Sequence, residues 1–213
     1  MKRKRLFFQS TLLSLSIVGP LFLSGCQMNQ QTPSLSTSGT TTAVADPNSI
    51  PVLHFKFHSF RGLCFDTYGC KVTYAGLAVP NDEPNEKTLS FAQWGGESGL
   101  KLAGGGGHIN IKNFPTPAKV TWRSKDGTSH SAEIDIGKIF KDERIIHHLP
   151  LREFAFQDNP MASSDDPTIV LVVDDRTIKV YMLASINTNR EQIPGNKYSY
   201  TKNELTLAYS QTF

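Results

Sequence analysis

The sequence predicts a mainly β fold, an antiparallel β-sandwich or small barrel with one short helix, between residues 51 and 213. In most of this region hydrophobic and polar residues alternate, which is the pattern of half-buried strands. The alternating segments are short, and turns rich in Gly and Pro separate them, as is typical of sandwiches and barrels. A region of about 160 residues is expected to be one domain. An α+β fold is the alternative, because one segment has a helical pattern.

The predicted strands follow one another along the chain with few interruptions. In the first predicted strand, Leu53, Phe55 and Phe57 alternate with polar residues. The run 168–173 is apolar throughout, as expected of a central strand. In order, the predicted strands cover residues 53–58, 71–78, 89–94, 109–112, 119–123, 132–136, 168–173, 178–182 and 205–209.

Two turns and one helix complete the predicted fold. Asp126-Gly127 lies between two alternating segments, which is a strong hairpin signal. Asp174-Asp175 separates the central strand from the next one and predicts a second hairpin. Residues 137–148 have the spacing of a helix, which Pro150 would end.

Residues 1–25 have the features of an export signal. Residues 2–5 are all Lys or Arg, and polar residues, Gly19 and Pro20 interrupt the apolar run that follows. A short, interrupted run of this kind is typical of a secretion signal and not of a membrane-spanning helix. The closing Leu23-Ser24-Gly25-Cys26 resembles the lipobox of bacterial lipoprotein signals.

The resemblance to lipoproteins implies that the chain is cut before Cys26 and that Cys26 receives the lipid. The protein would then be anchored on the periplasmic face of the bacterial envelope. Gln27 follows the cysteine, and in lipoproteins of enteric type a residue other than Asp there implies the outer membrane. We expect residues 26–50 to be a disordered tether, because Ser, Thr and Gln dominate and offer little apolar surface to bury.

The charge of the mature chain excludes a nucleic-acid binder. Of the 22 basic residues, four lie in the predicted signal, which leaves 18 against 19 acidic residues. Binding to nucleic acid needs a basic surface, and the mature chain has no excess of basic residues.

If Cys26 carries the lipid, two of the three cysteines remain to form a disulfide. Cys64 and Cys70 predict a disulfide, since an even pair in an exported protein usually oxidises. A ring this small contributes about 2 kcal/mol on the chain-entropy account. A redox-active pair is the alternative, but the spacing is not Cys-x-x-Cys and no helical pattern follows it.

Catalytic and metal-binding motifs are absent from the sequence. His54 and His58 lie on one face of the first predicted strand, but about 13 Å apart, too far to share a metal ion. Gly104–Gly107 leads into a strand and so does not resemble a phosphate loop. Ser98 lacks the second glycine of a nucleophile elbow. We therefore expect no enzyme activity, no cofactor and no metal site.

Loops supply the candidate binding residues. Asp82, Glu83 and Glu86 form a polar acidic connection that could meet a basic partner. Tyr198 and Tyr200 follow Pro194-Gly195 and are expected to be exposed. Trp94 and Trp122 are expected to be buried, because each lies in a strand pattern.

A central stretch also resembles a known group of proteins. Residues 117–127, followed by Ala132–Ile136 and the predicted helix, resemble small lipoproteins of Gram-negative bacteria. Some of these act as periplasmic immunity proteins of type VI secretion phospholipase effectors. The resemblance implies a lipid-anchored immunity protein that neutralises a secreted antibacterial effector by binding it. The alternatives are an envelope assembly or scaffold lipoprotein and a periplasmic hydrolase with dispersed catalytic residues.

Overall fold

The computed structural model of the chain describes residues 45–103 and 107–213. The predicted signal 1–25, the lipidation site Cys26 and most of the predicted tether lie outside the described residues. Within the described ranges, no helix is both long and apolar enough to cross a lipid bilayer.

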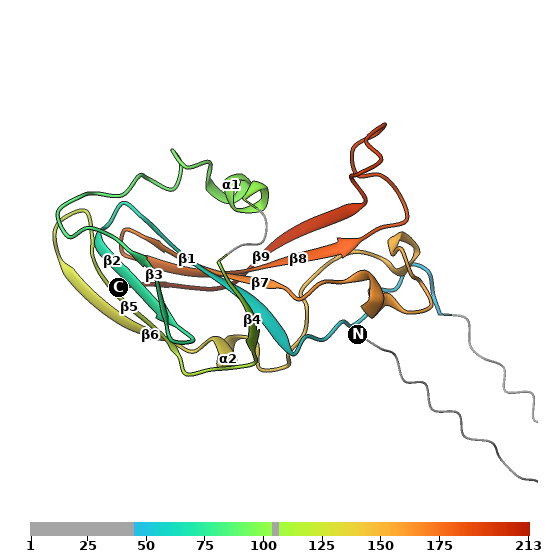
Figure 1. Cartoon of the computed structure of the whole chain (residues 1–213), viewed down its shortest axis with the longest axis horizontal. Helices are drawn as coiled ribbons and strands as arrows, with labels where there is room; N and C mark the ends of the chain where they lie inside the picture. The colour runs from blue at the N-terminus through green and yellow to red at the C-terminus, as the bar shows by residue number, and fades with distance from the viewer. Residues whose placement is uncertain (1–44, 104–106) are drawn as a thin grey trace, which may run out of the picture. The chain divides into compact units, whose positions relative to one another are not determined.

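The described strands form two sheets that pack against each other (Figure 1). The larger sheet has the order β4-β1-β7-β8-β9, and the smaller one the order β3-β2-β5-β6. Neither described sheet closes into a barrel, so the mainly β prediction is confirmed in its sandwich form. The strands are β1 (Phe57–Phe65), β2 (Tyr68–Tyr74), β3 (Leu77–Asn81), β4 (His108–Lys112), β5 (Ala118–Arg123), β6 (Ser129–Ile134), β7 (Thr168–Asp174), β8 (Thr177–Asn187) and β9 (Thr201–Thr212).

Pairing within the sheets is antiparallel except between β1 and β7, which run parallel. Both predicted hairpins are present. Asp126-Gly127 joins β5 to β6, where Gly127 has a φ of +82°. Asp174-Asp175 joins β7 to β8, where Asp175 has a φ of +53°. The β5–β6 turn and the β7–β8 turn therefore lie at the same end of the sandwich as the connection between β1 and β2.

The central strand β7 is buried on both faces. Ile169, Leu171 and Val173 contribute to the core between the sheets, whereas Val170 and Val172 belong to a second cluster on the other face. An apolar residue at every position is therefore what this strand needs.

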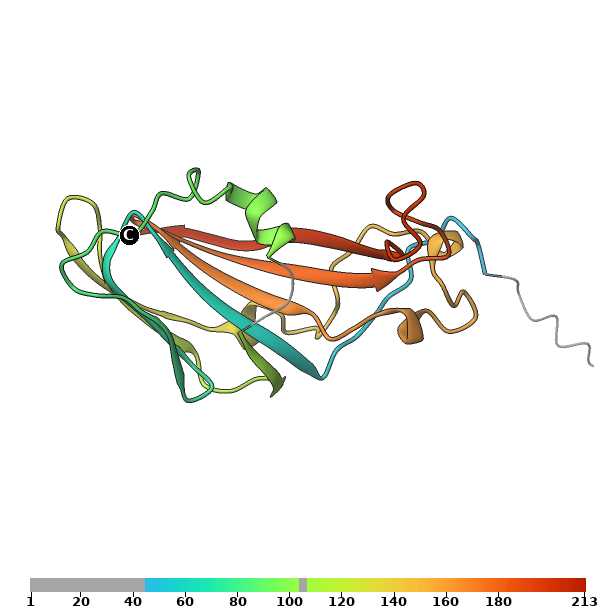
Figure 2. The same cartoon turned by 45° about the horizontal axis from the view of Figure 1, so that its top comes forward.

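The second cluster lies beneath α1 (Gly96–Leu102), which covers the outer face of the larger sheet (Figure 2). Leu100 of this helix is buried against the sheet, and Gly99 leaves room for Trp94, whose ring would lie 2.8 Å from a Cβ at position 99. The prediction of a strand over residues 89–94 is therefore wrong, and Ser98 lies within the helix. A helix this short depends on tertiary packing, which its own sequence does not reveal.

The helix predicted over residues 137–148 is also wrong beyond its first turn. Helix α2 covers only Ile136–Ile139, and Asp135 caps it by accepting a hydrogen bond from the Lys138 N–H at 2.9 Å. Glu143 then adopts a φ of +52°, and its carbonyl accepts a hydrogen bond from the Phe55 N–H at 2.9 Å. Arg144 forms a β-bridge with His54, and the Ile145 N–H donates to the Leu53 carbonyl at 2.9 Å, so the chain does not continue as a helix. Two short 3-10 helices follow, η1 (Leu151–Glu153) and η2 (Pro160–Ser163).

The folded domain begins before residue 51. The carbonyls of Pro47 and Ser49 accept hydrogen bonds from the N–H groups of Arg152 at 2.9 Å and Leu151 at 2.8 Å. The last residues of the predicted tether therefore lie on the folded domain.

Two of the predicted strands differ in detail. The run 71–78 is a hairpin and not one strand, because Ala75 and Gly76 both have positive φ values, 49° and 82°, and turn the chain from β2 into β3. The alternation at 53–58 breaks after Lys56, so that Phe57 is 38 % exposed and His58 is 0 % exposed.

His58 links the two sheets through a buried hydrogen-bond network. The Asn113 amide N–H donates to the Phe55 carbonyl at 2.9 Å, which turns its Oδ1 toward His58 Nδ1 at 2.8 Å. His58 Nδ1–H therefore donates, and Nε2 accepts from the Tyr74 hydroxyl at 3.0 Å. Burial lowers the pKa of His58 and raises that of Tyr74, so both groups remain neutral.

Candidate functional site

The predicted disulfide between Cys64 and Cys70 is present and joins the two sheets. Cys64 lies in β1 of the larger sheet and Cys70 in β2 of the smaller one, with a Cα–Cα distance of 6.3 Å. Cys70 is 0 % exposed and Cys64 is 9 % exposed. The disulfide thus fixes the corner at which the chain passes from one sheet to the other.

A pocket opens beside this corner because β4 pairs with only the first part of β1. The pairing with β4 ends at Phe60, and no described strand pairs with that edge of β1 along residues 63–65, which line the pocket. The pocket has a volume of about 390 Å³. We call it the disulfide pocket; its walls are formed by Leu63, Cys64, Phe65, Pro80, Asp82, Lys87, Thr88, Leu89 and Trp94.

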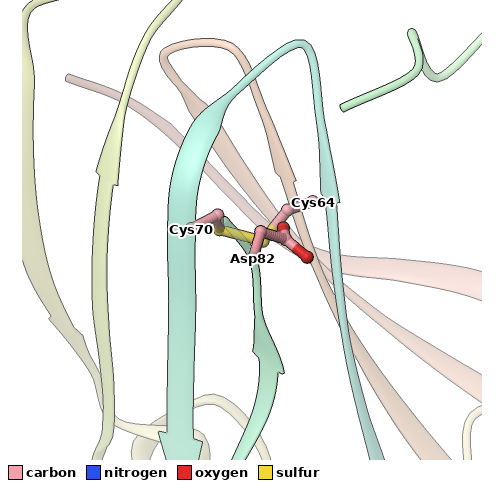
Figure 3. A group of neighbouring side chains, drawn as sticks. All are labelled: Cys64, Cys70 and Asp82. Atoms are coloured by element: carbon pink, nitrogen blue, oxygen red, sulfur yellow. A yellow bond between two sulfur atoms is a disulfide. The ribbon is translucent and has the colours of Figure 1, made fainter. Parts of the chain in front are cut away.

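Asp82 points its carboxyl toward the disulfide (Figure 3). A carboxylate oxygen of Asp82 and the two sulfur atoms all lie within 4.8 Å of one another. Its Oδ2 atom is buried and has no hydrogen-bond partner among the described residues. Burial therefore raises the pKa of the Asp82 carboxyl. The cysteine sulfurs are bonded to each other and so are not thiolate ligands for a metal ion in this state.

The acidic loop, which we define as residues 82–86, is held firmly against the start of β2. The Asp82 N–H donates to the Cys70 carbonyl at 2.9 Å, and the Gly69 N–H donates to the Glu83 carbonyl at 3.2 Å. Arg123 donates to the Pro84 carbonyl and lies over the Tyr68 ring. These contacts fix the backbone of the loop.

Gly69 permits the close approach of this loop. It has a φ of +53°, and a Cβ at this position would lie 3.1 Å from the Cα of Pro84. The positive φ and the nearby Pro84 backbone are two separate reasons for a glycine at this position.

Ion pairs hold the turns around the loop together. Asp66 of the β1–β2 turn pairs with Lys87 at 3.4 Å and with Lys125 of the β5–β6 turn at 3.7 Å. Lys125 also pairs with Asp175 of the β7–β8 turn at 3.9 Å. In the part of the chain that the structure describes, Glu83 forms no ion pair, nor does Glu86, and both are exposed.

The structure divides the predicted binding residues between two places. Asp82 lies in the disulfide pocket, with Glu83 and Glu86 beside it on the acidic loop. Tyr198 and Tyr200, 84 % and 42 % exposed, lie in the connection between β8 and β9. β8 has eleven residues and runs away from the disulfide corner, so roughly 35 Å of strand separates the two groups. They do not form one surface.

Sequence reasoning missed the apolar wall of the disulfide pocket. Leu89 is 61 % exposed, and Trp94 is half-buried, with its ring centroid 5.4 Å from that of Phe65. The sequence pattern predicts a strand for both residues, but they lie in a loop. Trp122, in contrast, is buried as predicted, and its indole N–H donates to the Asp175 carbonyl at 2.7 Å.

Comparison with known proteins adds no assignment to this geometry. No family, curated protein or solved structure matches the chain.

Proposed function

We propose that this chain is a lipid-anchored binding protein of the bacterial periplasm that neutralises a secreted antibacterial effector. In this proposal the acidic loop and the adjoining disulfide pocket bind a basic surface of the effector. One observation carries the proposal: two exposed carboxylates without ion-pair partners among the described residues are presented on a loop whose backbone is fixed from several sides.

The fixed backbone favours tight binding. A mobile loop loses conformational entropy when a partner orders it, and a loop that is already ordered avoids most of this loss. The disulfide and the Asp82–Cys70 backbone hydrogen bond supply that order here.

The chemistry of the site suits a partner that is both basic and apolar. Glu83 and Glu86 would attract Lys or Arg side chains, and charge complementarity of this kind accelerates association. Leu89 and Trp94 lie beside them and offer apolar surface for the centre of an interface.

The lipid predicted at Cys26 supports the same function. Anchoring at the membrane would raise the local concentration of the protein where a lipid-attacking effector works. Other predicted roles, a scaffold or a hydrolase, have no comparable structural support.

The proposal is tested in a strain that lacks this gene. The strain is challenged with a type VI secretion phospholipase effector, the class that the sequence resemblance implies, with and without the wild-type gene on a plasmid. We expect the deletion strain to die and the complemented strain to survive, and the two proteins to co-purify. Equal survival of both strains, without a complex, would contradict the proposal.

A further inference from the structure

The disulfide pocket is lined by one of the two cysteines of the disulfide and not by the other. Cys64 lines the pocket and is 9 % exposed, whereas Cys70 does not line it and is 0 % exposed. A thiolate breaks a disulfide by attacking one sulfur while the other leaves. A thiol that enters this pocket therefore meets Cys64, and the sulfur of Cys70 becomes the leaving group.

The leaving sulfur needs a proton. A thiolate at Cys70 would be fully buried, and burial without a partner strongly disfavours a charge. Among the described residues, the carboxyl placed to supply the proton is that of Asp82, one oxygen of which lies within 4.8 Å of both sulfurs.

The surroundings keep Asp82 suited to this role. Its Oδ2 is buried without a hydrogen-bond partner among the described residues, and burial favours its protonated form. The hydrogen bond from its N–H to the Cys70 carbonyl, 2.9 Å long, holds it beside the leaving sulfur. The charged groups on the neighbouring elements are Lys71 on β2, Glu83 next along the chain, and Lys87, which pairs with Asp66.

We propose that Cys64 is a site of thiol–disulfide exchange with low-molecular-weight thiols, with Asp82 as the proton donor to Cys70. The thiolate sulfur forms a bond to Cys64 Sγ, and the Cys64–Cys70 bond breaks. The electron pair of that bond passes to Cys70 Sγ, which takes the proton of the Asp82 carboxyl. The products are a mixed disulfide on Cys64, a neutral thiol at Cys70 and a carboxylate at Asp82.

The size and lining of the pocket define the class of thiol. A volume of about 390 Å³ is in the range of small-molecule sites. The wall is mostly apolar, with Lys87 as its cation. A thiol of tripeptide size or smaller, with a carboxylate to approach Lys87, fits this description.

The test uses the full chain, oxidised, with reduced glutathione as the probe. Newly freed thiols are trapped with iodoacetamide, and peptide mass spectrometry locates the glutathione and the alkyl group. We expect glutathione on Cys64 and the alkyl group on Cys70. Glutathione on Cys70, or equally on both, would overturn the proposal.

The role of Asp82 is tested by kinetics. The exchange rate constant is expressed per thiolate and followed against pH. In the wild type it should fall as pH rises and Asp82 loses its proton. In Asp82→Asn the rate constant should be at most about one tenth of the wild-type value and independent of pH.

Asp166→Asn is the matched control, because burial also raises the pKa of Asp166, which lies before β7 at the end of that strand far from the disulfide. It should behave as the wild type does. Equal rates in all three proteins, or a flat pH profile in the wild type, would overturn the assignment of Asp82. If circular dichroism shows that the Asp82→Asn protein does not fold, the wild-type pH profile and the position of the glutathione adduct test the proposal.

Discussion

At the scale of single residues, His58 is the clearest case of a side chain whose state follows from its neighbours. The Phe55 carbonyl orients Asn113, Asn113 determines which ring nitrogen of His58 carries the proton, and the other nitrogen accepts from Tyr74. A second ring proton, on Nε2, would reverse the hydrogen bond to Tyr74, whose hydroxyl would then have to accept. Protonation of His58 would also place a charge in this buried site between the sheets, which burial disfavours.

This arrangement predicts a loss of stability in mild acid. The pKa of His58 is lowered from 6.5 by burial. The stabilisation by the neutral ring is therefore complete above about pH 6.5 and is lost as pH falls below it, by at most about 1.4 kcal/mol per pH unit. The measurement is the unfolding free energy of wild type and His58→Gln in urea between about pH 8 and pH 5. The advantage of the wild type should shrink toward low pH.

The control for the His58 experiment is the same substitution at His54, which is exposed. His54→Gln removes an imidazole without opening the buried network. An advantage of wild type over His58→Gln that stays constant across the pH range would contradict the account.

Alternation alone could not locate His58. The polar positions 54, 56 and 58 were all predicted on one face of one strand, but β1 begins only at Phe57 and the pattern shifts there. A buried histidine between Tyr74 and Asn113 depends on residues distant in sequence, and a single sequence does not reveal such pairs.

At the scale of elements, the contact between the β1–β2 corner and the acidic loop rests on Gly69. A Cβ there would meet the Pro84 backbone at 3.1 Å in addition to the strain of a positive φ. We expect Gly69→Ala to destabilise the protein by about 1–2 kcal/mol and to loosen the loop. Urea unfolding measures the first effect, and the rate of proteolysis within residues 82–86 measures the second.

Gly127→Ala separates these two causes. Gly127 also has a positive φ, +82°, but a Cβ there would meet no atom within 4 Å. It should therefore cost less stability than Gly69→Ala and leave proteolysis of the acidic loop unchanged. Equal effects of the two substitutions on the loop would show that the Pro84 contact does not hold it.

Elements whose stability is local could be predicted, and those that depend on packing could not. The Asp126-Gly127 hairpin and the apolar strand β7 carry their own signals and were found. Helix α1 exists because Leu100 and Trp94 pack on the larger sheet, and Arg144 and Ile145 are not helical because they pair with residues 53 and 54. The disulfide pocket depends on where β4 ends, which sequence reasoning did not determine.

At the scale of the whole molecule, the proposal depends on a lipid at Cys26. Cys26→Ser should move the protein from the membrane fraction to the soluble periplasmic fraction, because it removes the site of the lipid that would anchor the protein. Cell fractionation and immunoblotting measure this. Gln27→Asp is the control, since it keeps the cysteine and should stay in the membrane fraction. A Cys26→Ser protein that still fractionates with membranes would refute the anchoring.

In the proposed function the acidic loop binds the effector, so a change in the charge of this loop tests the proposal most directly. Glu83→Lys with Glu86→Lys reverses two exposed charges without touching the disulfide or the core. Asp142→Lys with Asp158→Lys is the matched control, because both residues are exposed and lie outside the loop.

The decisive measurement is the affinity of these two variants and the wild type for the phospholipase effector used in the challenge, by biolayer interferometry at low and high salt. We expect the loop variant to bind at least about tenfold more weakly than the wild type, mainly through slower association. Its affinity should also lose most of the salt dependence. The control variant should bind like the wild type. Unchanged affinity of the loop variant, with wild-type salt dependence, would contradict the central claim that this loop binds the effector.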